Sequence, residues 1–224
     1  MKGKLIIIES GTDSSGKATQ TRKLFERLNK EQINLKKIAF PDYESESSSL
    51  VKMYLRGDFG KNPSDVDPYV ASTFFAADRY ASFKTKWDGF YNSGGLILAD
   101  RYTTSNMIHQ ASKMKVSERE KYLDWLYDFE YNMYKIPKPD LVLFLDMPVE
   151  KSFELMKNRK NEITGEDKKD IHESNYEYLK ECYNTGIEIA NKYNWKIIEC
   201  VQNNKLRTIE DIHEEIYSCV KEML

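Results

Sequence analysis

The sequence predicts an α/β fold in which a five-stranded parallel sheet is covered by helices on both faces. Short, almost wholly apolar segments alternate along the chain with longer segments whose apolar residues recur at helical spacing. Strands that are apolar on both faces belong to a sheet buried from both sides, as parallel sheets are. In addition, a glycine-rich sequence of the form GxxxxGK follows the first apolar segment directly, at residues 11–17.

The elements are expected in a regular order along a single domain that comprises residues 1–224. The apolar segments predicted as strands are 5–8, 37–40, 95–99, 141–145 and 195–199. The segments with helical spacing are 18–28, 47–55, 68–91, 118–134, 149–157, 173–193 and 209–223. Residues 157–171 interrupt this order, because they contain almost no apolar side chain and cannot form a buried element.

Composition excludes several classes of protein. The formal net charge of −2 argues against a protein that binds nucleic acid through bulk electrostatics. No apolar segment approaches the length of a membrane span, so no membrane association is expected. The three cysteines, Cys182, Cys200 and Cys219, lack metal-like spacing and are typical of reduced thiols. The first strand begins near the N-terminus without room for a signal peptide, so a cytoplasmic location is predicted.

Residues 11–17 have the residue types of a phosphate-binding P-loop, in the context of strand, loop and helix that such a loop needs. Two glycines let the backbone curl so that successive N–H groups point at one anion. The helix that follows adds the positive end of its dipole. Lys17 supplies a mobile positive charge for the outer phosphates. A P-loop NTPase fold is therefore predicted.

The residue after the P-loop lysine differs from the usual pattern. This position is normally Ser or Thr, whose hydroxyl contacts Mg²⁺, but here it is Ala18, with Thr19 next. Three interpretations stay open. The metal is held by water and carboxylates, or Thr19 compensates, or the loop binds nucleotide without efficient turnover.

Ligands of parallel α/β sheets bind outside the carboxyl ends of the strands, so the residues that follow each strand are candidates for function. The third strand is followed by Asp100, Arg101 and Tyr102, and the second by Pro41, Asp42 and Tyr43. On the helix that begins at Pro68, Phe75 and Arg79 share a face, where a ring beside a guanidinium could bind a flat base. By itself, this pair is more typical of a core aromatic and a solvated arginine. The polar segment 157–170 is either a surface loop or a lid over phosphates.

Taken together, these motifs resemble those of the thymidylate kinases, P-loop enzymes that transfer a phosphate from ATP to dTMP. The similarity extends over nearly the whole chain in the same order. The matching positions are 9–13, 16–17, 19–20, 40–41, 43, 75–79, 100–102, 105–106, 110, 138–141, 170, 173 and 183.

The resemblance implies a role for each matching residue. The residues that it assigns to catalysis are Lys17, Asp13, Arg101 and, in the lid segment of about 157–171, Arg159. Those that it assigns to ATP are Gly11, Ser14, Ser15, Gly16, Lys17, Ala18 and Thr19. Those that it assigns to dTMP are Asp13, Tyr43, Phe75, Arg79, Arg101, Asn106, His109 and Gln110. Mg²⁺ bound with ATP would be held by Asp13, Asp100 and Glu173, partly through water. A homodimer formed through helix 68–91 is also implied.

Two further positions depart from the family pattern. Asp42 stands where many relatives carry Arg or Glu, and His109 stands where an aromatic residue usually guards the 2′ position of the sugar. Two other functions are weighed against the leading one. A deoxynucleoside kinase would need a carboxylate base near a hydroxyl, and Asp42 could be interpreted in that way. A nucleotide-binding protein with impaired catalysis is supported by Ala18.

Overall fold

The centre of the protein is a five-stranded parallel sheet with the strand order β2-β3-β1-β4-β5. The structure is a computed structural model that describes residues 2–156, 170–172 and 175–224. The strands are β1 (Lys4–Glu9), β2 (Leu35–Ala39), β3 (Leu96–Asp100), β4 (Leu141–Asp146) and β5 (Lys196–Glu199). The α/β class and the parallel sheet predicted from the sequence are confirmed.

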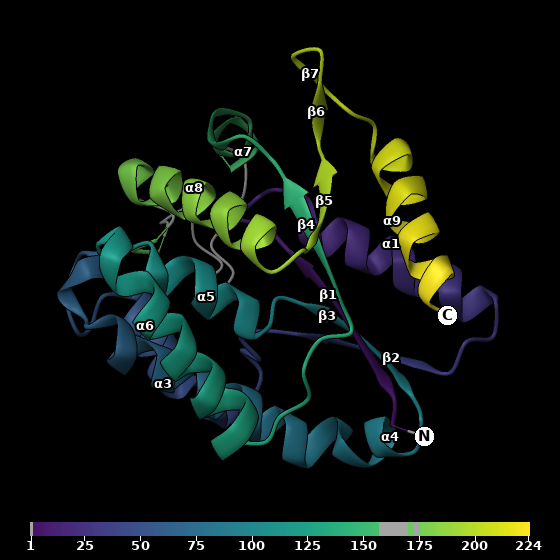
Figure 1. The fold of residues 1–224 in the computed structure, drawn as a ribbon, viewed down its shortest axis with the longest axis horizontal. Coiled ribbons are helices and arrows are strands. Elements are labelled where there is room, and N and C mark those ends of the chain that lie inside the picture. Colours follow the sequence, from purple (N-terminus) through teal and green to yellow (C-terminus); the bar gives the residue numbers. More distant parts are fainter. Residues whose placement is uncertain (1, 157–169, 173–174) are drawn as a thin grey trace.

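Helices connect these strands and cover the sheet (Figure 1). They are α1 (Lys17–Lys30), α2 (Ser49–Leu55), α3 (Pro68–Ser82), α4 (Asp88–Asn92), α5 (Thr103–Ala111), α6 (Val116–Tyr127), α7 (Val149–Met156), α8 (Tyr176–Lys192) and α9 (Ile209–Met223). The shorter elements are the 3₁₀ turns Glu46–Ser48 and Pro63–Asp65, the π-helical turns η3 (Phe83–Trp87) and η4 (Asp128–Met133), and the strands β6 (Val201–Gln202) and β7 (Lys205–Leu206).

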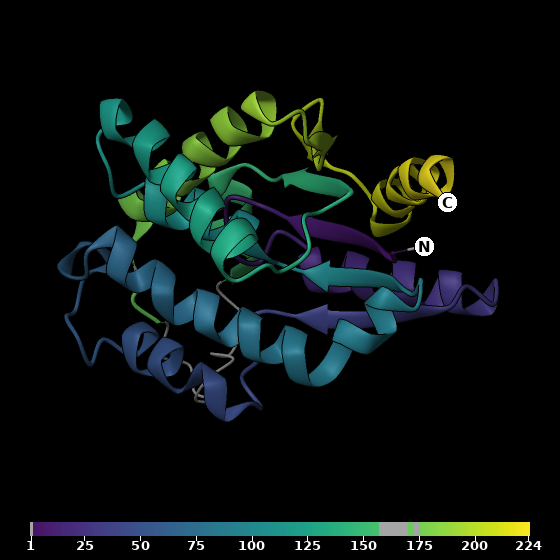
Figure 2. The same ribbon diagram turned by 60° about the horizontal axis from the view of Figure 1, so that its bottom comes forward.

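The alternation of side chains along the strands divides the core into layers on the two faces of the sheet. Ile6, Ile8 and Leu98 face α1 and α9, which lie side by side on one face. Leu5 and Ile7 face the opposite layer, which is built from α3, η3, α4, α5, α6 and α8 (Figure 2). Burial of both faces is the reason that the central strands are apolar throughout.

The edge strands are less apolar than predicted. Lys36 and Lys37 of β2 are exposed, and so are Lys196 and Glu199 of β5. An edge strand has a neighbour on one side only, and its ends reach solvent, so charged side chains are tolerated there and protect the edge.

Several helices differ from the predicted segments. α5 was not predicted at all, because its sequence TTSNMIHQA lacks a continuous apolar stripe. The predicted helix 68–91 is interrupted by η3, and the predicted helix 118–134 ends in η4. α8 begins at Tyr176, where the side chain of Asn175 accepts a hydrogen bond from the backbone N–H of Tyr178 (3.0 Å). Most of the predicted lid segment, including Arg159, and also Glu173, lies outside the described residues.

Candidate active site

The P-loop lies between β1 and α1, as predicted, and its two glycines have different roles. Gly16 precedes α1 with φ +92°, a conformation that L-residues rarely adopt. Gly11 does not need a positive φ. A Cβ atom there would lie 2.7 Å from the Cα of Tyr183 and 3.0 Å from the carbonyl oxygen of Cys182. The expectation that both glycines serve the curl of the loop was therefore incomplete, because Gly11 allows the loop to pack against α8.

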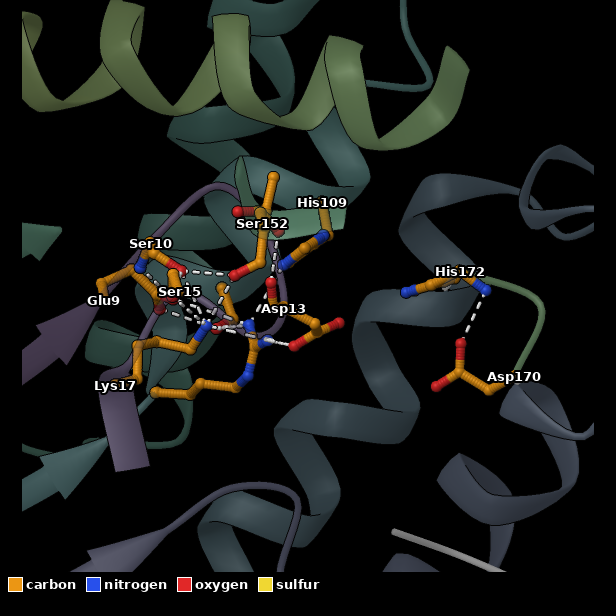
Figure 3. Close-up of polar contacts among 12 residues, drawn as sticks. Glu9, Ser10, Asp13, Ser15, Lys17, His109, Ser152, Asp170 and His172 are labelled. Atoms are coloured by element: carbon orange, nitrogen blue, oxygen red, sulfur yellow. Dashed lines mark hydrogen bonds and ion pairs between the residues drawn. The ribbon is translucent and has the colours of Figure 1, made fainter. Parts of the chain in front are cut away.

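Lys17, the first residue of α1, directs its ammonium back into the loop (Figure 3). Its Nζ donates to Ser10 Oγ (2.6 Å) and to the backbone oxygen of Thr12 (2.8 Å), with a longer contact to Ser15 Oγ (3.3 Å). Burial and the nearby guanidinium of Arg101 lower the pKa of Lys17 to about 8. A phosphate group in the loop would supply the anionic partner that favours the charged ammonium.

Asp13 joins the P-loop to the residues that follow β3. Its carboxylate pairs with Nη2 of Arg101, and Lys17 Nζ lies 4.0 Å from the same oxygen. The backbone oxygen of Asp13 accepts a hydrogen bond from Ser152 of α7 (2.5 Å). One carboxylate therefore lies between the two cations predicted to bind phosphate.

Arg101 is held by groups from β1, the P-loop and α5. Its Nη1 lies 3.3 Å from Ser105 Oγ, 3.1 Å from His109 Nε2 and 3.6 Å from the carboxylate of Glu9. Its backbone has φ +66°, an unusual conformation for an arginine that is common at functional sites. Burial lowers the pKa of Arg101, but the carboxylates of Asp13, Glu9 and Asp100 outweigh this effect and raise the pKa above its usual value.

Glu9 has a positioning role that the sequence did not reveal. This fully buried residue at the end of β1 accepts hydrogen bonds from Thr104 Oγ1 (2.7 Å) and Ser105 Oγ (2.6 Å) of α5. Its other oxygen accepts from the backbone N–H of Ser10 (3.0 Å). Glu9 thereby ties the beginning of the P-loop to the helix that follows Arg101.

A cavity of about 750 Å³ opens at this edge of the sheet. Residues 13–19, from the P-loop and the start of α1, line it together with Asp100, Arg101 and Tyr43. Its lining also includes Leu206, Arg207 and Ile209, which extend from the end of β7 to the start of α9. These last residues were not predicted, although Asn203 and Asn204 marked a tight turn just before them.

Asp13 and Asp100 are the described residues among those predicted to hold a metal ion, and both line this cavity. Within residues 2–156, 170–172 and 175–224 no group of three or more His, Cys, Asp or Glu side chains could hold a metal ion by itself. One or two carboxylates combined with the phosphates of a nucleotide are, however, the usual ligands of Mg²⁺. The oxygen donors of Asp13 and Asp100 therefore fit an ion that arrives with a nucleotide.

The residues predicted to bind the acceptor base lie on α3 and α5. Phe75 packs edge-on against Tyr54, with ring centroids 6.0 Å apart. Arg79 is buried and forms a bidentate ion pair with Glu130 of η4, at 2.6 and 2.7 Å. Asn106 contacts the same carboxylate at 3.3 Å. The resemblance assigns Arg79 and Asn106 to dTMP without indicating that a buried acid joins them.

His109 and Gln110 of α5 are both buried. The ring of His109 stacks on that of His172, with centroids 5.8 Å apart, and Gln110 lies beside the hydroxyl of Tyr54. Burial and the charge of Arg101 lower the pKa of His109 to about 3. His109 is therefore neutral at ordinary pH.

Asp42 is engaged away from the cavity. Its carboxylate pairs with Lys86 of η3, and its backbone N–H donates to Asp78 (2.8 Å). Asp42 does not line the cavity, in contrast to its neighbours Pro41 and Tyr43. This arrangement does not support Asp42 as a catalytic base for a nucleoside hydroxyl.

The fold and the site define a P-loop phosphotransferase, with a phosphate-binding loop after β1 and a second cationic centre after β3. The family model for thymidylate kinase matches residues 8–216. The chain therefore belongs to the thymidylate kinase family.

Curated relatives and a solved structure agree with this assignment. The human thymidylate kinase is 27% identical over 215 residues, which cover 96% of this chain and 88% of that protein. A probable thymidylate kinase of Pyrococcus horikoshii is 28% identical over 225 residues, covering 100% and 98% of the two chains. The structure of the Candida albicans thymidylate kinase superposes with a TM-score of 0.69 at 23% identity, covering 99% of this chain and 92% of that one. This structural match supports the fold.

Proposed function

We propose that the protein transfers the γ-phosphoryl group of ATP to dTMP, giving ADP and dTDP. One observation carries the proposal beyond family membership. Lys17 of the P-loop and Arg101 of the second centre contact the same carboxylate oxygen of Asp13 and line one cavity. Two cations so placed can hold two phosphate groups face to face.

The chemistry follows from the charges of the substrates. The attacking oxygen of a nucleoside monophosphate is already anionic, so the reaction needs no strong general base. The main obstacle is repulsion between two polyanions, which Lys17, Arg101 and the P-loop N–H groups reduce. Asp42, paired with Lys86, is not placed to deprotonate a hydroxyl, which favours a monophosphate acceptor over a nucleoside.

Mg²⁺ is proposed as the cofactor that binds with ATP. Asp13 and Asp100 would hold it together with the phosphates, and the ion would supply further charge neutralisation. Burial raises the pKa of Asp100, while the charges of Lys17 and Arg101 oppose this rise. Ala18 provides no hydroxyl, so in this chain the carboxylates and water would supply more of the ligands of the Mg²⁺ ion. Glu173 and Arg159 are proposed for the metal shell and the transferred phosphate on family resemblance.

Base recognition is proposed to lie between α3 and α5. Stacking on the ring of Phe75 would hold the thymine plane, while Arg79 and Asn106 would form hydrogen bonds with the edge of the base. Tyr43 would contact the acceptor phosphate beside Arg101, and both residues line the cavity. The buried, neutral ring of His109 would limit the space near the sugar.

A homodimer in the cytoplasm is proposed as the working form. Val70 and Tyr80 of α3 and Met133 of η4 are exposed apolar side chains on the layer that contains the predicted interface helix. Such side chains are typical of interaction surfaces when they gather on one face. No helix in the described part of the chain is long and apolar enough to cross a membrane.

The test is ADP formation by the purified protein with Mg-ATP and a set of acceptors. The set is dTMP, dUMP, UMP, dCMP, dGMP, thymidine and no acceptor. Turnover mainly with dTMP is expected. Turnover with thymidine would instead indicate a nucleoside kinase, and binding of dTMP without turnover would indicate a binding protein.

A further inference from the structure

Glu130 is a fully buried carboxylate on the π-helical turn η4, more than fifty residues from its partner Arg79. The Arg79 Nε atom donates to Oε2 at 2.7 Å, and its Nη2 atom donates to Oε1 at 2.6 Å. The side-chain exposures are 2% for Arg79 and 0% for Glu130. Two parallel hydrogen bonds in a buried pair fix the plane of the guanidinium as well as its charge.

The same carboxylate also orients Asn106. The Asn106 Nδ2 atom donates to Glu130 Oε1 (3.3 Å) and to the backbone oxygen of Ser72 (3.2 Å). With its nitrogen directed at two acceptors, the amide offers its oxygen as the acceptor for another partner. Arg79 uses Nε and Nη2 for Glu130, and its Nη1 takes no part in either bond.

Together, the two side chains offer one donor from Arg79 and one acceptor from Asn106. A pyrimidine with an oxygen at C4 and a hydrogen on N3 presents the complementary acceptor and donor. A pyrimidine with an amino group at C4 and a bare N3 presents the opposite pattern, so two mismatched pairs would be buried. The order of donor and acceptor that distinguishes these bases is set by Glu130, the acid that orients both side chains.

We propose that Glu130 is a positioning residue that sets the selectivity of this enzyme for a 4-oxo over a 4-amino pyrimidine nucleotide. It acts through Arg79 and Asn106 and does not touch the base itself. The inference rests on the proposed function, since it names the residue that selects the acceptor at that same site.

The test compares Glu130→Gln with the wild type, using dTMP and dCMP on the same preparation. The measured quantity is the ratio of kcat/KM for the two acceptors, or of their Kd values by calorimetry where turnover is slow. This ratio is independent of the fraction of protein that is folded. Glutamine can accept only one of the two hydrogen bonds, so we expect the dTMP preference to fall by about tenfold or more, mainly through KM for dTMP. KM for ATP is expected to change by less than about twofold.

Two further variants separate positioning from a merely structural role. Arg79→Gln and the double variant R79Q/E130Q should have acceptor ratios within about threefold of each other, because once Arg79 is absent Glu130 acts only through Asn106. The double variant keeps a neutral hydrogen-bonding pair in the same space, so it provides this comparison even if E130Q alone does not fold. Glu181→Gln is the matched control, since Glu181 pairs with Arg119, another largely buried arginine, on α6 and outside the cavity.

The outcomes distinguish this inference from the proposed function. An acceptor ratio in E130Q within twofold of the wild-type value, or one in the double variant more than about tenfold below that of R79Q, would overturn the positioning role. Loss of selectivity in E181Q would also overturn it, because the effect would then follow any weakened ion pair. A wild-type protein that does not phosphorylate dTMP would overturn the proposed function instead.

Discussion

Gly11 lies against Tyr183 so closely that a Cβ atom on the glycine would be 2.7 Å from the Cα atom of the tyrosine. Backbone atoms of α8 cannot move away as a flexible side chain would. The contact makes α8 one wall of the P-loop, and the position of the loop depends on the packing of a helix more than 160 residues later in the chain.

Gly11→Ala should therefore displace the loop from α8. We expect the free energy of unfolding to fall by about 2 kcal/mol, which is typical of overpacking in a rigid site, together with a loss of turnover. Chemical denaturation and the dTMP kinase assay measure the two effects. Gly89→Ala is the control, because no atom lies within 4 Å of a Cβ there and φ is not positive. Equal stability of the two variants would contradict this account of Gly11.

The buried ammonium of Lys17 predicts a specific dependence of stability on pH. Its pKa in the folded protein is lowered to about 8 from an ordinary value of 10.5, because burial and Arg101 disfavour the charge. Between these two values the unfolded chain binds more protons than the folded protein, so folding becomes more favourable as the pH rises. Below about pH 8 the cost of burying the charge is present in full.

Lys17→Met removes this titration and keeps the length of the side chain. The difference in unfolding free energy between the wild type and this variant should shift in favour of the wild type as the pH rises from about 8 to 10.5, by an amount on the order of 3 kcal/mol. Denaturation curves at intervals of half a pH unit measure it, and titrations common to both proteins cancel. A difference that stays constant with pH would mean that Lys17 has its ordinary pKa.

The location of the candidate site could be predicted from the sequence because it depends on the order of strands, loops and helices along the chain. Residues 11–17 follow a strand and begin a helix, and Arg101 follows the next strand in space, so the topology of a parallel sheet brings them to one edge. The assignment needed no knowledge of side-chain packing. The thymidylate kinase family was indicated by the same motifs in their order.

The missed features are those that depend on distant partners. Glu130 lies in an apparently solvent-facing helical segment, and only the fold brings Arg79 to it. α5 buries Asn106, His109 and Gln110, so its polar residues obscured the helical pattern. By contrast, the β6–β7 hairpin had a readable signal, since Asn203 and Asn204 both adopt positive φ in its two-residue turn.

Arg101 should serve the acceptor more than ATP. The Arg101→Ala variant loses a cation that lies beside Asp13 and the carboxyl ends of β2 and β3. We therefore expect KM for dTMP to rise at least about tenfold and kcat to fall. Initial rates with each substrate varied in turn measure both constants. Arg56→Ala, which removes an exposed arginine paired with Asp58, should leave them unchanged. Equal increases in KM for ATP and dTMP would argue against the assignment of Arg101 to the acceptor.

Ala18 allows a direct test of how the metal is held. The residue is exposed in the first turn of α1 and lines the cavity, so a larger side chain can be accommodated. Ala18→Thr supplies the hydroxyl that P-loops usually carry next to the lysine. We expect the Mg²⁺ concentration for half-maximal rate to fall by several-fold, with unfolding free energy changed by less than about 1 kcal/mol.

Ala18→Val is the matched control for this substitution, because valine has the shape of threonine without its hydroxyl. If Asp13, Asp100 and water hold the ion in the wild type, threonine should add a ligand and valine should not. A fall in the Mg²⁺ requirement with threonine alone would therefore show that the hydroxyl position is accessible to the metal. The same response with both residues would assign the effect to packing against the loop. No response with either would show that the carboxylates already hold the ion in a geometry that a hydroxyl at residue 18 does not reach.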